Sequence, residues 1–387
     1  MPFVVIALLC VLGFPLSAAA QSAPAEWRLE KQESAFAGGT IRETVWSAAR
    51  PPHGLFDRVA VHRYRGTEPA RAVLLYLPGT NMNGIAAVKE ESHNLWLFLA
   101  ARGIEVFTID YRTRFVPPTT PPTALSSLEA WTMEAFVGDI AAAADLVRRE
   151  SGREQLFVAG FSRGVSLAYA YVSTDAARVA GLIALDGGFK SHAPKDAYDA
   201  AAARQKLAES GMWASDVAGS RGWDWRQALM DSVAANPDGP ATDAKFKTKG
   251  DELANVLQFA WGPGGLANPV GGVSRPRTLA TLLGGYDRYY PAIQDVDGRS
   301  IADRADDPRT AIDDAWGELT TPIILFASTG MTPDFLMDGI YSATKSGSPD
   351  VTINVMERYG HLDILVAEAA QREVYQPLLD WIVDRAK

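Results

Sequence analysis

The sequence predicts an α/β fold in which a mostly parallel central sheet is flanked by helices. Short apolar runs alternate with helical patterns along most of the chain. Runs of this kind are typical of strands covered on both faces, because the helices that connect parallel strands bury them. The alternation stops between Phe189 and Glu318 and then resumes, which indicates an insertion into the fold.

Six apolar runs are expected to form the parallel strands: Val73–Leu77, Ile104–Ile109, Leu156–Ala159, Leu182–Leu185, Ile323–Ala327 and Val351–Met356. Helical patterns lie between several of them: Leu95–Ala101, Leu128–Arg149 and Val165–Val172. Two earlier segments, Ile41–Trp46 and Val59–Tyr64, alternate apolar and polar residues. They are expected to be antiparallel strands at the edge of the sheet.

The composition limits the class of protein. Of the 387 residues, 47% are hydrophobic and 21% are charged, which suits a globular chain with a large core. The formal net charge is -9, so a general nucleic-acid binder is not expected. The only cysteine in the sequence, Cys10, lies in the apolar run at the N-terminus, so disulfides and cysteine-ligated metals are not expected in the mature fold.

The N-terminal residues resemble a signal peptide. An apolar run from Phe3 to Leu16 precedes Ser17 and three alanines that end at Ala20. The run is too short to span a bilayer comfortably, so we expect residues 1–20 to be removed and the mature chain to begin at Gln21. No later stretch is long and apolar enough for a transmembrane helix. A periplasmic or secreted protein without stable membrane insertion is predicted.

The inserted segment, residues 189–318, separates a first core part, residues 21–188, from a second, residues 319–387. It contains helical patterns around Ala200–Ser210 and Trp225–Ala235. A long loop without structure is uncommon in a compact domain, so we expect a partly helical cap over the carboxyl edge of the sheet. Five of the ten tryptophans fall in this segment, where most should form its core and some should line a substrate pocket.

The chemistry concentrates at Gly160-Phe161-Ser162-Arg163-Gly164, a G-x-S-x-G motif between an apolar run and a helical pattern. In this setting the serine occupies a sharp, strained turn from strand to helix. Glycine is needed two residues before and after it, since side chains there would collide with the neighbouring strand or helix. Ser162 is therefore the candidate nucleophile.

From Val59 to Arg385 the chain resembles the α/β-hydrolases, in which an insertion commonly follows the sixth core strand. The resemblance implies a catalytic triad in the order serine, acid, histidine. Of the five histidines, His361 follows the last predicted strand, in Tyr359-Gly360-His361, and is the candidate general base. His192, the other histidine after Ser162, lies at the start of the insertion.

The resemblance leaves the triad acid open. The commonest family position, after the seventh strand, nominates Asp334, although Thr332-Pro333-Asp334 is also a typical helix start. A minority of the family has the acid after the sixth strand, where Asp186 follows Leu185. Asp338 is a third candidate.

The family's oxyanion hole implies two backbone N–H groups. One comes from the residue after the nucleophile, here Arg163, and the other from the loop that follows the run Val73–Leu77. In this loop Pro78-Gly79 replaces the usual His-Gly, and Thr80 or Asn81 is the expected donor.

These residues predict a serine hydrolase that cleaves carboxylic esters, small or polymeric, through an acyl-enzyme. No cofactor or metal is expected, since the sequence has no nucleotide-binding glycine motif and no cluster of metal ligands. Amide or peptide cleavage is the alternative within the same chemistry. A binding protein that keeps the fold without catalysis is the alternative outside it.

Overall fold

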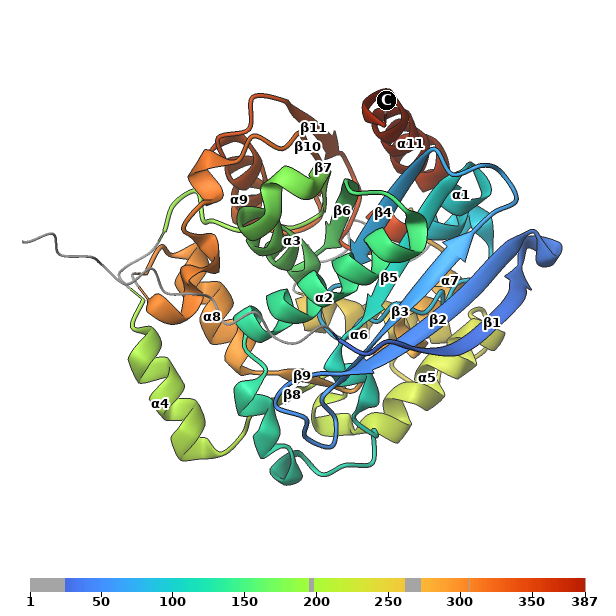
Figure 1. Ribbon diagram of the computed structural model, residues 1–387. Helices are drawn as coiled ribbons and strands as arrows, with labels where there is room; N and C mark the ends of the chain where they lie inside the picture. Colours follow the sequence, from blue (N-terminus) through green and yellow to red (C-terminus); the bar gives the residue numbers. More distant parts are fainter. Residues whose placement is uncertain (1–24, 195–197, 262–272, 306, 387) are drawn as a thin grey trace, which may run out of the picture.

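The central feature of the computed structural model is a sheet of nine strands in the order β1-β2-β3-β5-β4-β6-β7-β10-β11 (Figure 1). The structure describes residues 25–194, 198–261, 273–305 and 307–386, so the predicted signal peptide lies outside the described residues. The pairs β1–β2, β2–β3 and β3–β5 are antiparallel. From β5 to β11, every neighbouring pair of strands is parallel. A mostly parallel sheet is therefore confirmed.

The strands of this sheet are β1 (Arg28–Phe36), β2 (Ile41–Ala49), β3 (Arg58–Arg65), β4 (Ala72–Leu77), β5 (Ile104–Asp110), β6 (Leu156–Phe161), β7 (Val179–Leu185), β10 (Ile323–Ser328) and β11 (Val351–Met356). All six predicted parallel runs are strands. Strand β1 was missed, because its residues Arg28–Phe36 are mostly polar and exposed and lack the apolar alternation of a half-buried strand.

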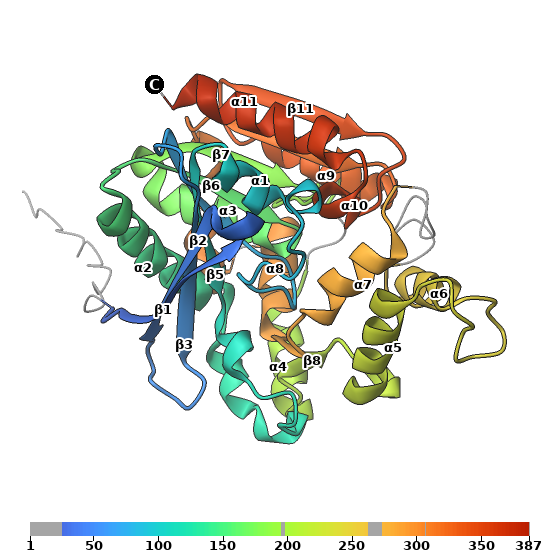
Figure 2. The ribbon, with the colours of Figure 1, turned by 90° about the vertical axis from the view of Figure 1, so that its right-hand side faces the viewer.

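Helices cover both faces of the sheet: α1 (Leu95–Ala101), α2 (Met133–Ser151), α3 (Arg163–Asp175), α9 (Pro333–Thr344), α10 (Asp363–Val366) and α11 (Gln376–Arg385). Figures 1 and 2 show α2 and α3 on one side of the strands and α1 and α11 on the other. Among the described residues, no helix is long and apolar enough to cross a bilayer.

Alternate residues of the parallel strands face different layers. Leu74 and Tyr76 of β4 join the cluster that contains α1 and α11, whereas Val73, Leu75 and Leu77 join the cluster that contains α2 and α3. Because successive side chains of a strand point to opposite faces, a strand between two helical layers must be apolar at every position. This explains why these strands were recognisable as continuous apolar runs.

The helix α2 begins later than predicted. The sequence pattern suggested a start at Leu128, but the helix starts at Met133 and Thr132 is its N-cap, accepting a hydrogen bond from the N–H of Ala135 at 3.1 Å. A threonine N-cap satisfies an N–H group that has no partner within the helix. The residues from Ser126 to Ala130 form a separate 3-10 turn.

Between β7 and β10 the chain forms α4 (Ala200–Ser210), β8 (Ala214–Asp216), α5 (Trp223–Ala235), α6 (Lys249–Trp261), α7 (Pro276–Gly284), β9 (Tyr289–Pro291) and α8 (Ile293–Ala302). Strands β8 and β9 pair antiparallel, a feature that their three-residue length hides from sequence analysis.

The aromatic residues of this segment differ from the expectation of a separate core. Trp213 and Tyr289 belong to the apolar cluster on the α2 side of the sheet, and Tyr286 belongs to the cluster on the α1 side. The apolar residues of the inserted segment are thus continuous with the two clusters that cover the sheet, while α5, α6 and α7 pack chiefly against one another.

Candidate active site

Ser162 lies on the turn that joins β6 to α3, as the motif predicted. Its backbone has φ 55° and ψ -122°, a conformation that is unfavourable for a residue with a side chain. The N–H of Ser162 donates to the carbonyl of Leu185 at 3.1 Å, and its carbonyl accepts from the N–H of Val165 at 2.9 Å. These bonds hold the serine in the strained turn between two strands and a helix.

Both glycines of the motif are required by close backbone contacts. A Cβ atom on Gly160 would lie 2.1 Å from the carbonyl oxygen of Gly164. A Cβ atom on Gly164 would lie 2.0 Å from the carbonyl oxygen of Leu77. These distances are far below van der Waals contact, so the predicted collision with the helix and with the neighbouring strand is present.

His361 follows β11 and is buried in the loop that leads to α10. Its Nδ1 lies 2.7 Å from Oδ2 of Asp186. The imidazole ring stacks on Phe161, the residue before Ser162, with 4.6 Å between the ring centroids. The ring of Phe335 lies nearly perpendicular to the imidazole, with 5.5 Å between the centroids. Two aromatic rings and a carboxylate therefore fix the imidazole beside the Ser162 turn.

Asp186 directly follows β7 and is only 1% exposed. Its carboxylate accepts hydrogen bonds from the N–H of Ser328 at 2.6 Å and from the hydroxyl of Ser328 at 2.8 Å, in addition to its contact with His361. The next residue, Gly187, packs so closely that a Cβ atom there would lie 2.6 Å from the carbonyl oxygen of Ser162. The structure thus brings the ends of β6, β7 and β11 together.

The other two acid candidates lie against a different histidine. Asp334 stands in the first turn of α9 with a side chain that is 72% exposed, and its carboxylate is 4.0 Å from Nε2 of His192. Asp338 accepts hydrogen bonds from the N–H of His192 at 2.8 Å and pairs with its Nδ1 at 2.7 Å. Thr332 caps α9 as predicted, accepting from the N–H of Phe335 at 3.2 Å.

The loop after β4, residues 78–84, meets Ser162 at Gly79. A Cβ atom on Gly79 would lie 3.1 Å from Cβ of Ser162, so the backbone of this loop touches the nucleophile candidate. Thr80 and Asn81 follow directly, and Asn81 has a left-handed φ of 62°. Within the described residues, the N–H groups of Thr80 and Arg163 donate to no protein acceptor. The side chain of Arg163 turns to α8, donating from Nη2 to Asp295 at 2.8 Å.

Two residues of the site were missed at the sequence level. Ser328 ends β10 and holds the Asp186 carboxylate, a role visible only from the parallel pairing of β7 with β10. Asp363 is too close to His361 along the chain to be its carboxylate partner. Its carboxylate accepts hydrogen bonds from the N–H of Gly360 at 2.7 Å and from the hydroxyl of Ser274. Burial raises the pKa of this carboxyl group. Asp363 thereby fixes the backbone on which His361 is carried.

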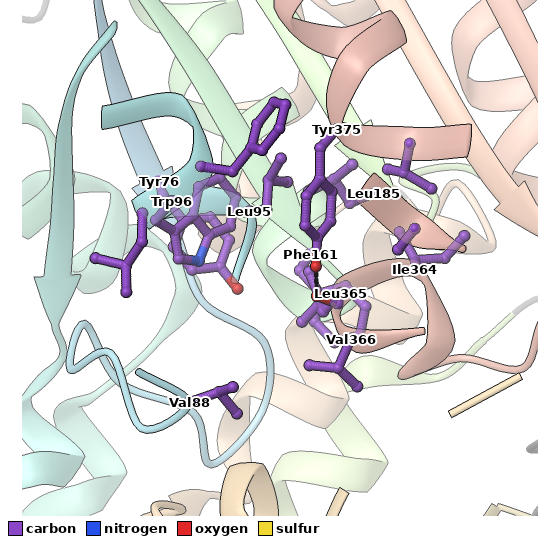
Figure 3. Packing of buried hydrophobic residues seen from close by; sticks show 14 of the residues in the cluster. Tyr76, Val88, Leu95, Trp96, Phe161, Leu185, Ile364, Leu365, Val366 and Tyr375 are labelled. Carbon is purple, nitrogen blue, oxygen red and sulfur yellow. Dashed lines mark hydrogen bonds between the residues drawn. The ribbon is translucent and has the colours of Figure 1, made fainter. Parts of the chain in front are cut away.

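The apolar packing beneath the histidine loop supports this geometry. Figure 3 shows Ile364, Leu365 and Val366 of α10 beside Leu185, Phe161 and Tyr375. The hydroxyl of Tyr375 donates to the carbonyl of Leu365. The helix after His361 is therefore embedded in the core, so the loop has little freedom to shift.

No model of a known protein family matches the chain, and no curated protein matches it. Among solved structures it is similar to a candidate lipase from Sulfolobus solfataricus, with 24% identity over 93% of this chain and 99% of that one and a TM-score of 0.75. The chain has the α/β-hydrolase fold. In this fold the carboxyl ends of the parallel strands carry the site, which is where Ser162, Asp186 and His361 meet.

Two further α/β-hydrolase matches have lower TM-scores. A monoacylglycerol lipase from Paleococcus ferrophilus is 15% identical over 84% of this chain and 99% of that one, with a TM-score of 0.48. A carboxyl esterase from Bacillus coagulans is 13% identical over 95% of this chain and 100% of that one, with a TM-score of 0.47. At these identities the similarity concerns the fold, and the activity must be argued from the site.

Proposed function

We propose that the protein is a serine hydrolase that cleaves carboxylic esters, with Ser162 as nucleophile, His361 as general base and Asp186 as triad acid. The observation that carries the proposal is the buried hydrogen bond between His361 and Asp186 beside the strained turn of Ser162. Residues in strained conformations persist only where the surrounding structure holds them, and they concentrate at active sites.

The three side chains have complementary roles in this mechanism. The Asp186 carboxylate accepts the hydrogen bond from Nδ1 of His361, 2.7 Å away, and so leaves Nε2 free of a proton. Nε2 takes the proton of the Ser162 hydroxyl as the oxygen attacks the ester carbonyl. The proton then passes to the leaving alcohol, and an acyl-enzyme forms that water hydrolyses in the reverse sequence.

The negative charge that develops on the carbonyl oxygen requires donors that are already in position. Backbone N–H groups of Arg163 and Thr80 are the proposed donors, since Arg163 follows Ser162, Thr80 follows Gly79 at the Ser162 turn, and neither N–H group has a protein acceptor among the described residues. Asn81 is the alternative on the same loop. Such preorganised donors stabilise the transition state because they need no rearrangement during the reaction.

A substrate panel tests the reaction class. We expect the purified protein to hydrolyse aryl and alkyl esters faster than the matching aryl amides. The panel compares acyl groups from acetyl to dodecanoyl. An alcohol is a better leaving group than an amine, so the acyl-enzyme forms faster from the ester. Faster release from the amides would favour the peptidase alternative. A protein that turns over neither class and resists a fluorophosphonate would be a non-catalytic member of the fold.

We also propose that the protein is periplasmic or secreted and that Gln21 is its mature N-terminus. The support is the apolar run Phe3–Leu16 followed by Ala18, Ala19 and Ala20. N-terminal sequencing of protein expressed from the full gene should therefore begin at or close to Gln21. Full-length protein recovered from the membrane fraction would contradict cleavage and indicate an anchored protein.

A further inference from the structure

The inserted segment reaches back to the loop that carries the proposed oxyanion donors. In the turn formed by residues 285–288, between α7 and β9, the N–H of Asp287 donates to the carbonyl of Asn81 at 2.7 Å. The side-chain amide of Asn81 donates in return to the carbonyl of Asp287 at 3.0 Å. This reciprocal pair fixes Asn81, which has a left-handed backbone that asparagine adopts more readily than most residues.

The Asp287 side chain adds a second set of contacts. One carboxylate oxygen accepts from the side-chain amide of Asn83 at 3.0 Å, and the other accepts from the hydroxyl of Thr113 at 3.1 Å. The amide of Asn83 also donates to the carbonyl of Gly285 at 2.8 Å. With a side chain only 3% exposed, Asp287 joins the turn 285–288 to the loop after β4 and to the loop after β5.

The far end of loop 78–84 is fixed by the core instead. The N–H of Gly84 donates to Asp110 at 2.7 Å, and the hydroxyl of Tyr64 donates to the carbonyl of Gly84 at 3.0 Å. A Cβ atom on Gly84 would lie 2.7 Å from the hydroxyl oxygen of Thr108, so this end cannot move inward. Asn81 and Asn83, nearer to Ser162, depend on the turn 285–288.

We propose that Asp287 is a positioning residue that holds loop 78–84 so that its N–H groups face the reacting carbonyl. This proposal rests on the proposed function. It assigns the inserted segment a part in the chemistry: the turn 285–288 must be docked for the oxyanion hole to be complete. Asp287 acts through its neighbours: its backbone holds Asn81, and its carboxylate holds Asn83 and Thr113.

The electrostatic surroundings of Asp287 are consistent with a tightly docked side chain. Burial, together with the nearby Asp110 carboxylate on β5, raises the pKa of Asp287 to about 7, and Arg114 at 3.7 Å opposes the shift only in part. Behind Asp110 lies His62. Burial lowers its pKa, but Asp110 and Glu43 outweigh this and raise it to about 9, so it is positively charged at neutral pH.

Kinetics of three variants test the positioning role. Asp287→Ala removes the carboxylate contacts to Asn83 and Thr113 but keeps the backbone pair with Asn81. It should therefore lower kcat for an aryl ester by a factor on the order of 10, with a much smaller change in KM, whereas outright loss of one oxyanion donor costs about 10² to 10³. Asn83→Ala should have a weaker effect of the same kind. Asp287→Asn should retain most of kcat, because the amide oxygen can still accept from Asn83 and the hydroxyl of Thr113 can accept from its NH₂.

Glu252→Ala is the matched control in the same segment. Glu252 on α6 is also a buried carboxylate, and it accepts from the N–H of Thr242 at 3.0 Å. It makes none of the contacts to Asn81, Asn83 or Thr113, so its loss should leave kcat close to that of the wild type. Equal kcat in Asp287→Ala and the wild type would overturn the positioning role. So would an equal loss of kcat in Glu252→Ala and Asp287→Ala.

Two readouts do not depend on activity. By hydrogen exchange, amides of residues 79–83 should exchange faster in Asp287→Ala, while those of Gly84, β6 and α2 are unchanged. The raised pKa means that ionised Asp287 lowers folding stability as pH rises from about 4 to about 7. The melting temperature of Asp287→Asn relative to the wild type should therefore increase over this range and then level off.

These readouts separate the two proposals. If the wild type hydrolyses no ester, the proposed function fails, while hydrogen exchange still decides whether Asp287 holds the loop. If the wild type is active but Asp287→Ala keeps both kcat and the protection of residues 79–83, the positioning role is wrong and the proposed function stands.

Discussion

Replacement of Ser162 by alanine is expected to abolish ester hydrolysis and covalent labelling by a fluorophosphonate. Both reactions need the hydroxyl oxygen of the nucleophile, and in a comparable triad enzyme loss of the serine lowers kcat by roughly 10⁶. The measurement is labelling followed by mass spectrometry of the modified peptide, together with steady-state turnover. Thermal melting checks that the variant folds with an alanine in the strained turn.

Ser166→Ala is the matched control for this experiment. Ser166 lies on the same helix, α3, and its hydroxyl donates to the carbonyl of Gly188 at 2.8 Å, so it is a serine with a structural partner near the same turn. It should keep both turnover and labelling. Persistent labelling of Ser162→Ala would place the nucleophile elsewhere in the chain.

Replacement of Asp186 by asparagine is expected to lower kcat by a factor on the order of 10³ to 10⁴, as for the acid of the worked serine-protease triad. The asparagine amide can donate to Nδ1 of His361, which stabilises the tautomer in which Nε2 carries the proton and cannot act as base. Asp186 has a left-handed φ of 47°, a conformation that asparagine also tolerates, so the variant should fold.

Asp334→Asn and Asp338→Asn are the comparison variants. Asp334 is mostly exposed on α9, and both carboxylates lie beside His192 instead of His361. Turnover should therefore fall only slightly. Loss of a carboxylate from the first turn of α9 should cost about 0.3–1 kcal/mol of stability at most, through the helix dipole. A large loss of kcat in Asp334→Asn, with Asp186→Asn active, would move the acid to α9.

Most strands of the fold could be predicted from the sequence, because a run of apolar residues is a local pattern. The runs that became β4, β5, β6, β7, β10 and β11 are apolar at nearly every position, as burial on both faces demands. Strand β1 was not predicted, because it is mostly polar and contains no such apolar run. It is a strand only through its pairing with β2. Strands β8 and β9 are too short to carry a pattern.

Some residues of the candidate site could also be predicted from the sequence, and others could not. The sequence alone determined Ser162, because two glycines at fixed spacing between an apolar run and a helical pattern describe a turn that few other sequences require. His361 was singled out by the resemblance to the α/β-hydrolases, whose order of serine, acid and histidine implies a histidine after the last strand. The motif at Ser162 uses residues that are neighbours along the chain, whereas the assignment of His361 uses the order of strands.

Only the tertiary structure decided which carboxylate meets His361. Asp186 and Asp334 both follow strands whose carboxyl ends lie at the same edge of the sheet, so the spacing of residues could not separate them. The parallel pairing of β7 with β10 brings Ser328 to the Asp186 carboxylate and leaves Asp334 on the surface of α9. The contact between Asp287 and Asn81 is likewise tertiary. Hydrogen bonds between residues this distant depend on how whole elements pack, and no local pattern in a single sequence records that packing.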